Sequence, residues 1–443
     1  MNGARASSPT LARHIGLLFL IAYGVGDIVG SGIYGTIGVA AGMMGNAVWL
    51  AFAAAMVAAM LTGLTYASIS SRYPRAAGAA YVVQRAFRAP LLSYLVGLAV
   101  MASGLTSIAT AGNVFARNLA VLLGGAPPWL LIVAFLGALT AINLWGIRES
   151  MWANLLCTVI EVGGLIFIIA VGMRYWGGVD YLATPQGVPG HSGLGLSMLL
   201  TGAVLTFYSF VGFEDMINVA EEVKHPERTL PWGLVVSVAI AAVLYIAVSI
   251  TAVSVVPAVE LADISRGAPL VQITGRAAPW LSPWVFSAIT LFAVANTALI
   301  NYIMGSRLAY GMARQGLLPR YLGAVHARRR TPHYAILTLF AVALALALTG
   351  NIPTLARATA LLLLSVFAVI NLSLLVLKAR RGEARGHFEV PAWVPAGGIA
   401  TCLIMIAHAK RGELAVVGAL LAVILGLYAL MRPKGLPESG AQR

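Results

Sequence analysis

Two stretches of the chain decide its fold: residues 24–33 read GVGDIVGSGI, and residues 207–215 read FYSFVGFED. Each lies in an apolar run that is long enough to cross a membrane, although glycine costs about 1 kcal/mol in a helix interior. Backbone that leaves the helix at membrane depth is tolerated only where it lines a cavity or is buried in protein. We therefore predict a broken helix at both stretches. For the first stretch, glycines that merely allow close helix packing are the alternative.

The composition of the whole chain identifies its class. Of 443 residues, 60% are hydrophobic and 10% are charged, whereas soluble domains carry about 25% charged residues. A membrane helix needs about 20 apolar residues, so a soluble protein and a separate soluble domain are excluded. We predict an all-α polytopic membrane protein with twelve transmembrane helices, near 15–42, 47–70, 91–123, 128–146, 151–173, 196–219, 231–256, 281–310, 332–350, 354–377, 392–409 and 414–431.

The basic residues predict the orientation of the chain. Of the 29 Lys and Arg, 22 fall in segments on the side of the N-terminus and 7 on the other side. Because positive charge collects in cytoplasmic loops, both tails, 1–14 and 432–443, are predicted to be cytoplasmic. The net charge of +14 is thereby explained without a nucleic-acid partner. We expect a monomeric protein of the cell membrane, with the lipid bilayer as its surroundings.

The positions of the two broken helices suggest an internal repeat. The first opens a group of five helices over 15–175, and the second opens another five over 196–378. Matched broken helices in two halves are typical of inverted-repeat transporters. The remaining two helices, over 392–431, are expected to be peripheral.

Four segments together resemble the amino acid–polyamine–organocation (APC) superfamily of transporters. They are GSGI at 30–33, RYPRAAG at 72–78, FVGFED at 210–215 followed by AEEVKHPER at 220–228, and SRLAYGMARQGLLP at 306–319. The resemblance implies a LeuT-like fold in which helices 1–5 and 6–10 are inverted repeats. It also implies that substrate binds between the two breaks.

The breaks suit a zwitterionic amino acid or related amine. Free N–H groups at a half-helix N-terminus attract a carboxylate, and free carbonyls near Ile28, Phe207 and Phe210 can accept from an ammonium group. An ordinary bundle-facing role is the alternative for Phe207 and Tyr208. The predicted substrate site comprises Ile28, Gly30, Ser31, Gly32, Ile33, Phe207, Tyr208, Ser209, Phe210 and Gly212, with Gly97 and Met101 from the third helix facing the side-chain pocket.

Placing an acidic side chain within the membrane costs free energy, so the acidic residues of the predicted membrane helices are candidates for a functional role. Glu161 is the leading candidate for a proton carrier, because burial favours the neutral form of a carboxyl and a proton carrier needs that form. By resemblance, some proton-coupled relatives carry a lysine here, where sodium-coupled relatives hold their ion. Glu161 is therefore a proton carrier, a sodium ligand with Asn296, or a fixed hydrogen-bonding group. Protons are favoured, since residues 293–298 contain one hydroxyl.

The other acids leave alternatives open. Asp27 shares a proton with Glu161 or pairs with a cationic substrate, and Glu214 stands where arginine–agmatine exchangers carry a glutamate tied to pH response. Asp215 is expected to be solvated near the cytoplasmic side. Five charged residues are expected at that face too, where they form an inner gate of ion pairs or a solvated charged surface: Glu221, Glu222, Arg72, Arg75 and Arg307. The predicted proton-coupling set is Asp27, Glu161, Glu214 and Asn296, with no metal site and no cofactor.

Other classes of function find little support. The chain lacks the His-Glu-x-x-His pattern of a membrane metalloprotease and the glycine-rich phosphate loop of an ATP-driven pump. A channel is disfavoured because no filter-like sequence repeats. We predict a proton-coupled amino acid permease that works by alternating access, with an amino acid or amine exchanger or a polyamine transporter as the alternative.

Overall fold

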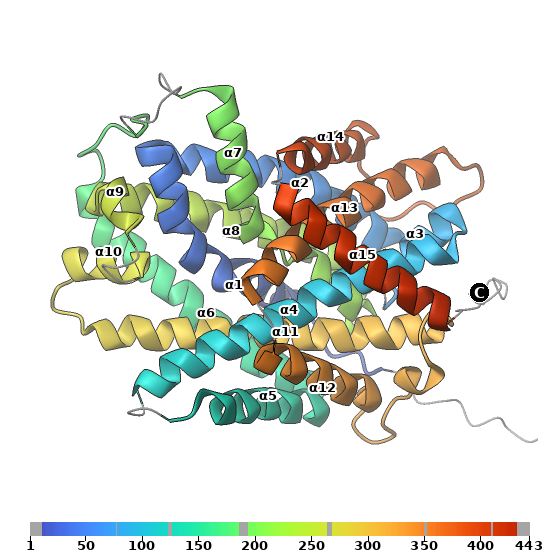
Figure 1. Cartoon of the computed structure of the whole chain (residues 1–443). Coiled ribbons are helices and arrows are strands. Elements are labelled where there is room, and N and C mark those ends of the chain that lie inside the picture. Colours follow the sequence, from blue (N-terminus) through green and yellow to red (C-terminus); the bar gives the residue numbers. More distant parts are fainter. Residues whose placement is uncertain are drawn as a thin grey trace, which may run out of the picture.

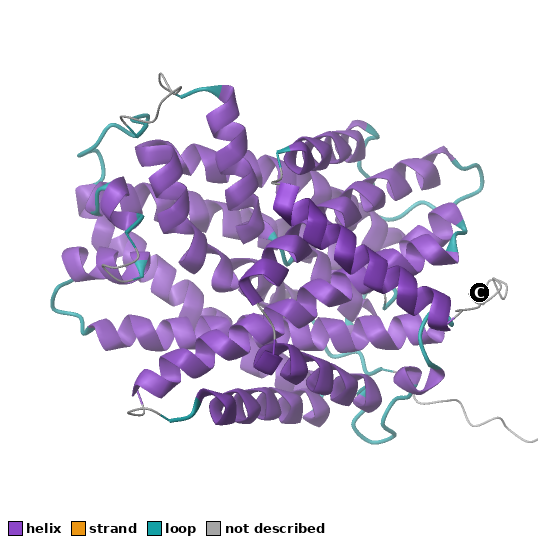
Figure 2. Cartoon of the chain, viewed as in Figure 1, coloured by secondary structure: helices purple, strands orange, loops and turns teal. Residues whose placement is uncertain are grey.

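The computed structural model describes residues 11–76, 78–122, 126–185, 194–263, 268–349, 352–408 and 411–431. This part of the chain is almost entirely helical (Figures 1 and 2), and a single isolated bridge joins Ile15 to Val223. The predicted tails lie largely outside the described residues, because 1–10 and 432–443 are not among them.

The predicted polytopic all-α fold is confirmed. Within the described residues, nine helical segments are long and apolar enough to cross a membrane, and three shorter apolar helices lie at 333–348, 393–407 and 417–431. Together they match the twelve predicted runs one to one. The helices are α1 (Leu17–Met44), α2 (Val48–Arg72), α4 (Pro90–Leu122), α5 (Pro128–Trp145), α6 (Ile147–Gly172), α7 (Leu196–Phe207) with η4 (Phe213–Glu222), α8 (Pro226–Val255), α11 (Pro283–Arg314), α12 (His333–Thr349), α13 (Ile352–Ala379), α14 (Trp393–Ala407) and α15 (Arg411–Met431).

Short helices occupy the connections. They are η1 (Gly45–Ala47), α3 (Gly78–Phe87), η2 (Met173–Tyr175), η3 (Tyr208–Phe210), α9 (Ala258–Leu261), α10 (Pro269–Ala277) and η6 (Arg320–Gly323). Proline begins several helices, as at Pro128 and Pro226, where its missing N–H is not needed.

Both ends of the described chain lie on one side of the bundle. Leu11 packs with Ala76, just after α2, and the Met431 sulfur accepts a hydrogen bond from Tyr94 near the start of α4. This agrees with the predicted even number of crossings. That this side is the cytoplasm stays a prediction from charge.

The helix contacts join segments that lie far apart in the sequence. α1 packs on α8, and α7 packs on α2. α4 and α11 cross each other at the centre of the bundle (Figure 1). α14 packs on α13 and α2, and α15 packs on α13 and α4. The division into two repeats of five helices with two peripheral helices stays a prediction.

Candidate functional site

The first break in the chain is confined to one residue. Gly30 has φ 2° and ψ −138°, inside an otherwise continuous α1. A Cβ at Gly24, Gly26 or Gly32 would approach a neighbouring element to within 2.9 Å. These three glycines therefore serve close packing, which was the alternative to unwinding. The unwound segment is narrower than the glycine run suggests.

The second break is wider. α7 ends at Phe207, the short η3 follows, Val211 is extended, and Gly212 adopts φ 131° before η4 begins. That φ lies in a region that favours glycine. The chain turns at Gly212 and directs the first residues of η4 back toward α1.

The two breaks touch each other. A Cβ on Gly32 would lie 2.9 Å from the Ser209 Cα, and one on Gly212 would lie 3.0 Å from the backbone carbon and Cγ of Asp27. Tyr245 of α8 joins the breaks, because its hydroxyl lies within hydrogen-bonding distance of the carbonyl oxygens of Ile28 and Ser209. The Ile28 carbonyl, predicted to accept from a substrate ammonium, is thus already engaged by Tyr245.

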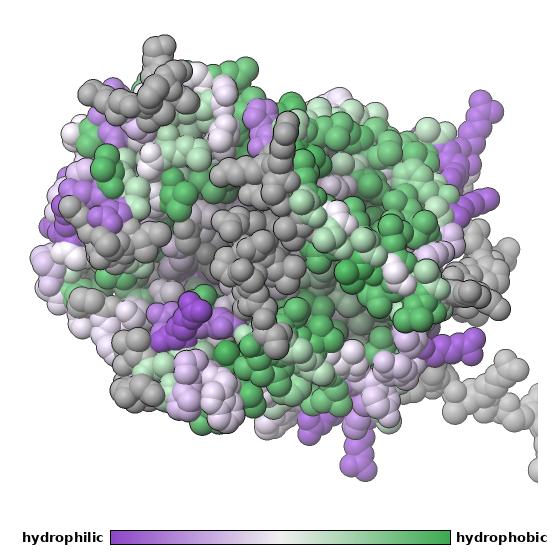
Figure 3. All heavy atoms as spheres, in the orientation of Figure 1, coloured by the Kyte–Doolittle hydropathy of each residue, from purple (hydrophilic) through white to green (hydrophobic). Residues whose placement is uncertain are grey.

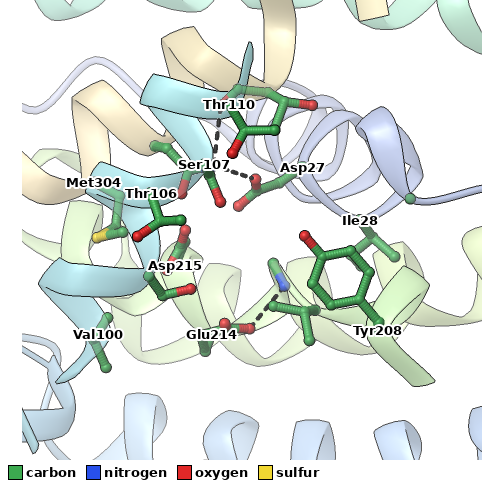
Figure 4. Close-up of a pocket in the computed structure, with 16 residues that line it drawn as sticks. Asp27, Ile28, Val100, Thr106, Ser107, Thr110, Tyr208, Glu214, Asp215 and Met304 are labelled. Carbon is green, nitrogen blue, oxygen red and sulfur yellow. Dashed lines mark hydrogen bonds between the residues drawn. The ribbon is translucent and has the colours of Figure 1, made fainter. Parts of the chain in front are cut away.

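A cavity lies at this meeting point (Figure 4). Six predicted site residues line it: Asp27, Ile28, Gly32, Tyr208, Gly212 and Glu214. The others that line it are Val100, Ser103, Thr106, Ser107, Thr110, Val211, Asp215, Thr297, Asn301 and Met304. Tyr208 is 40% exposed and stands at its edge.

Three carboxyl groups face this cavity. Asp27 Oδ1 lies 3.5 Å from the Asn301 Nδ2 donor, and its buried Oδ2 has no hydrogen-bond partner among the described residues. Glu214 Oε2 accepts from the Gly212 N–H at 2.8 Å. Asp215 is buried, so the prediction that it is solvated near one face is wrong, because the turn at Gly212 brings it inside. The residues described as lining the cavity include no Lys, Arg or His.

The hydroxyl-bearing wall of the cavity was missed from sequence. Ser103, Thr106, Ser107 and Thr110 come from α4, and their spacing of three or four residues places them on one helix face. That stripe is a readable signal. Gly97 and Met101, predicted for this helix, do not line the cavity. A Cβ on Gly97 would lie 2.5 Å from the Met312 sulfur, so this glycine is a packing contact.

Other predicted residues support the site from behind. Phe210 packs edge-on against Tyr245, with ring centroids 5.0 Å apart. The hydroxyls of Ser209 and Thr36 are 2.7 Å apart. Phe207, also buried, packs against Phe367, which is the bundle-facing alternative. Ile33 is buried in the core, Gly30 approaches the Thr297 hydroxyl, and the side chain of Ser31 lies outside the described residues.

Glu161 belongs to a second polar cluster. It is fully buried in α6, where Oε2 accepts from Asn296 Nδ2 at 3.4 Å and Oε1 has no partner in the described chain. Asn296 also donates to Thr158 at 3.0 Å and accepts from Asn154 at 2.8 Å. Asn154 and Thr158 share one face of α6 with Glu161 and were missed.

The two predicted proton groups belong to different environments. Glu161 does not line the cavity that Asp27 faces, and no hydrogen bond joins the two carboxyls among the described residues. The described chain also offers no group of three or more His, Cys, Asp or Glu suited to a metal ion.

A buried ion pair closes the bundle on the side where the chain ends lie. Arg307 Nε lies 2.9 Å from Glu222 Oε2, and both side chains are fully buried. Arg307 also donates to Asn143 of α5 at 2.7 Å. The Glu222 carbonyl accepts from the N–H groups of His14 and Ile15. This pair therefore ties the entry of α1, η4, α5 and α11 together, so the alternative of a solvated surface is wrong for Glu222 and Arg307.

Comparison with known proteins agrees with this architecture. A family profile described as amino acid permease matches residues 15–432. The chain is 26% identical to the branched-chain amino acid permease of Bacillus subtilis, covering 96% of this chain and 93% of that one. It is 29% identical to the mitochondrial cationic amino acid transporter 3 of Arabidopsis thaliana, covering 83% and 63%. It is 27% identical to the methylthioribose transporter of B. subtilis, covering 88% and 86%.

Proposed function

The chain belongs to the amino acid permease family, and from that premise we propose that it is a proton-coupled secondary transporter of amino acids that carry a positive side chain. It is a multi-pass membrane transport protein and not an enzyme. We place it in the cell membrane with both termini in the cytoplasm, in keeping with the charge bias of its loops.

The observation that carries the substrate class is the set of carboxyl groups in the cavity wall, because a bound cation would favour their ionised form. Asp27, Glu214 and Asp215 supply three carboxyl groups there, and no basic side chain is among the lining residues described. The Asp27 Oδ2 atom accepts no hydrogen bond from the described residues, although the carboxyl interacts with that of Asp215, and a buried polar atom of this kind is costly unless it is paired. An ammonium or guanidinium group on the substrate supplies the missing donor.

The substrate carboxylate is assigned to the break in α1. The φ and ψ of Gly30 interrupt α1, and we assign the carboxylate to the N–H groups that follow, because N–H groups at the start of a helix carry partial positive charge. Gly32 lines the cavity and has no side chain to cover them. The names of the relatives include both neutral and cationic substrates and do not distinguish between these classes. The proposal that the substrate is cationic therefore depends on the residues that line the cavity.

Proton coupling is assigned to Glu161. Its carboxyl is fully buried, its one described side-chain partner is an amide, and one of its oxygens has none. A buried carboxylate without a cation is expensive, which favours a proton on Glu161 while the cluster is closed. Release follows when alternating access opens this region to water. Sodium, held by Glu161, Thr158 and Asn296, is the competing assignment.

The test is uptake by the purified protein in liposomes. An inward proton gradient and then an inward sodium gradient are applied to labelled neutral, cationic and acidic amino acids and to polyamines. We expect uptake of cationic amino acids driven by protons. Asp27→Asn should lose the preference for cationic substrates, whereas the exposed control Glu149→Gln should keep it. Preference for neutral or acidic amino acids in the unaltered protein would refute the substrate class.

Glu161→Gln separates coupling from binding. We expect this variant to bind substrate and to exchange it across the membrane, but to lose stimulation by the proton gradient. Unchanged proton-driven uptake would remove Glu161 from the mechanism. Uptake only into preloaded liposomes, under any gradient, would instead identify an obligate exchanger.

A further inference from the structure

The connection between α11 and α12 carries a cluster of arginines without nearby acids along the chain. Arg320, Arg328, Arg329 and Arg330 lie within it, and the sequence contains no Asp or Glu between Asp263 and Glu383. Arg320, Arg328 and Arg329 are exposed. We call residues 326–331 the arginine loop. This segment of the sequence contains no acidic residue beside the exposed Arg328 and Arg329.

The arginine loop has a fixed shape. The His326 N–H donates to the Thr331 carbonyl at 2.8 Å, and the Arg330 N–H donates to the His326 carbonyl at 2.9 Å. The Thr331 hydroxyl lies 3.4 Å from the Leu144 carbonyl near the end of α5. A ligand therefore meets guanidinium groups on a loop that is already ordered, which reduces the entropy lost on binding.

Aromatic residues place this loop at the level of lipid headgroups. Trp129 and Trp145 stand at the two ends of α5 and are 59% and 63% exposed. Sixteen residues at 1.5 Å each separate them by about 24 Å, comparable to the roughly 30 Å hydrocarbon core of a bilayer. Tryptophan collects at both membrane interfaces. The Arg329 guanidinium lies over the Trp145 ring at 6.0 Å, so it shares that level.

The surface beside the loop is suited to acyl chains. Leu337 and Val342 of α12 are exposed apolar residues, and α12 packs against α5. Figure 3 shows one face of the molecule, on which a broad hydrophobic area lies beside hydrophilic side chains that project at the edge. An occupant therefore needs a negative head and an apolar tail.

We propose that the arginine loop and Trp145 form a binding site for the phosphate of an anionic phospholipid. Arginine matches phosphate in a forked, two-bond geometry, and basic residues at a membrane surface attract anionic lipids. The acyl chains lie along α5 and α12. This site is separate from the cavity and does not depend on the transported substrate.

The test measures lipid retention by native mass spectrometry of the purified full chain. Phosphatidylglycerol, phosphatidylcholine and inorganic phosphate are titrated in separate arms. The double variant Arg328→Gln with Arg329→Gln is compared with the control Arg381→Gln with Arg385→Gln, which removes equal charge elsewhere. We expect the first to weaken phosphatidylglycerol binding roughly 30-fold and the control to change it little. Melting temperatures verify that both are folded.

Several outcomes would overturn the proposal. Retention of phosphatidylcholine equal to that of phosphatidylglycerol would show that the protein does not distinguish lipids by headgroup charge. Equal weakening in both double variants would show a general charge effect without a site. Competition by inorganic phosphate at the same concentration would identify a site for free anions instead of a lipid.

Discussion

Gly212→Ala probes whether the contact between the two breaks is obligatory. The added Cβ would lie 3.0 Å from both the backbone carbon and the Cγ of Asp27, and φ 131° is unfavourable for alanine. Backbone strain costs about 1–3 kcal/mol, and overpacking a tight core costs a further 1–3 kcal/mol or so. We expect a loss of about 2–6 kcal/mol in the free energy of unfolding, relieved only by moving Asp27.

The assay for this variant has two readouts. Thermal unfolding in detergent reports stability, and substrate-induced stabilisation reports affinity, which should fall about tenfold or more since each 1.4 kcal/mol is a factor of ten. Gly137→Ala is the matched control. A Cβ there meets nothing within 4 Å, so alanine should stabilise the α5 interior by about 0.5–1 kcal/mol. If Gly212→Ala melts and binds like the unaltered protein, the close approach of the breaks is not what organises the site.

Two further predictions concern other parts of the structure. Tyr245→Phe keeps the ring that packs on Phe210 but removes the hydroxyl that joins the breaks; it should cost about 1–3 kcal/mol of stability and weaken substrate binding, and an unchanged melting curve would contradict that role. Partial burial opposes ionisation of Glu389, but hydrogen bonds from Arg72 and Lys378 lower its pKa to about 2. The stability that this carboxylate contributes is therefore present above about pH 5 and is lost as the pH falls toward 2. Melting temperatures of Glu389→Gln and the unaltered protein should differ at pH 7 and converge in acid; a constant difference would exclude the ion pair as its cause.

The sequence predicted those parts of the candidate site whose residue types are energetically costly in a membrane helix. Gly212 and the acids beside it stand out because glycine and carboxylates are costly in membrane helices. The hydroxyl stripe of α4 was readable by its spacing but carries no such cost, so it did not stand out. Gly97 was predicted to face the pocket but packs against Met312. In sequence, a glycine needed for packing looks the same as one that faces a cavity.

The sequence by itself determined the membrane class, the twelve helices and the positions of both breaks. Those features follow from local composition, because the bilayer constrains each segment separately. Only the tertiary structure decided that Asp215 turns inward with Asp27, that Glu161 joins Asn296 in a cluster of its own, and that Glu222 pairs with Arg307. These arrangements depend on where segments far apart in the chain meet, and helix periodicity does not specify which face of one helix packs against which face of another.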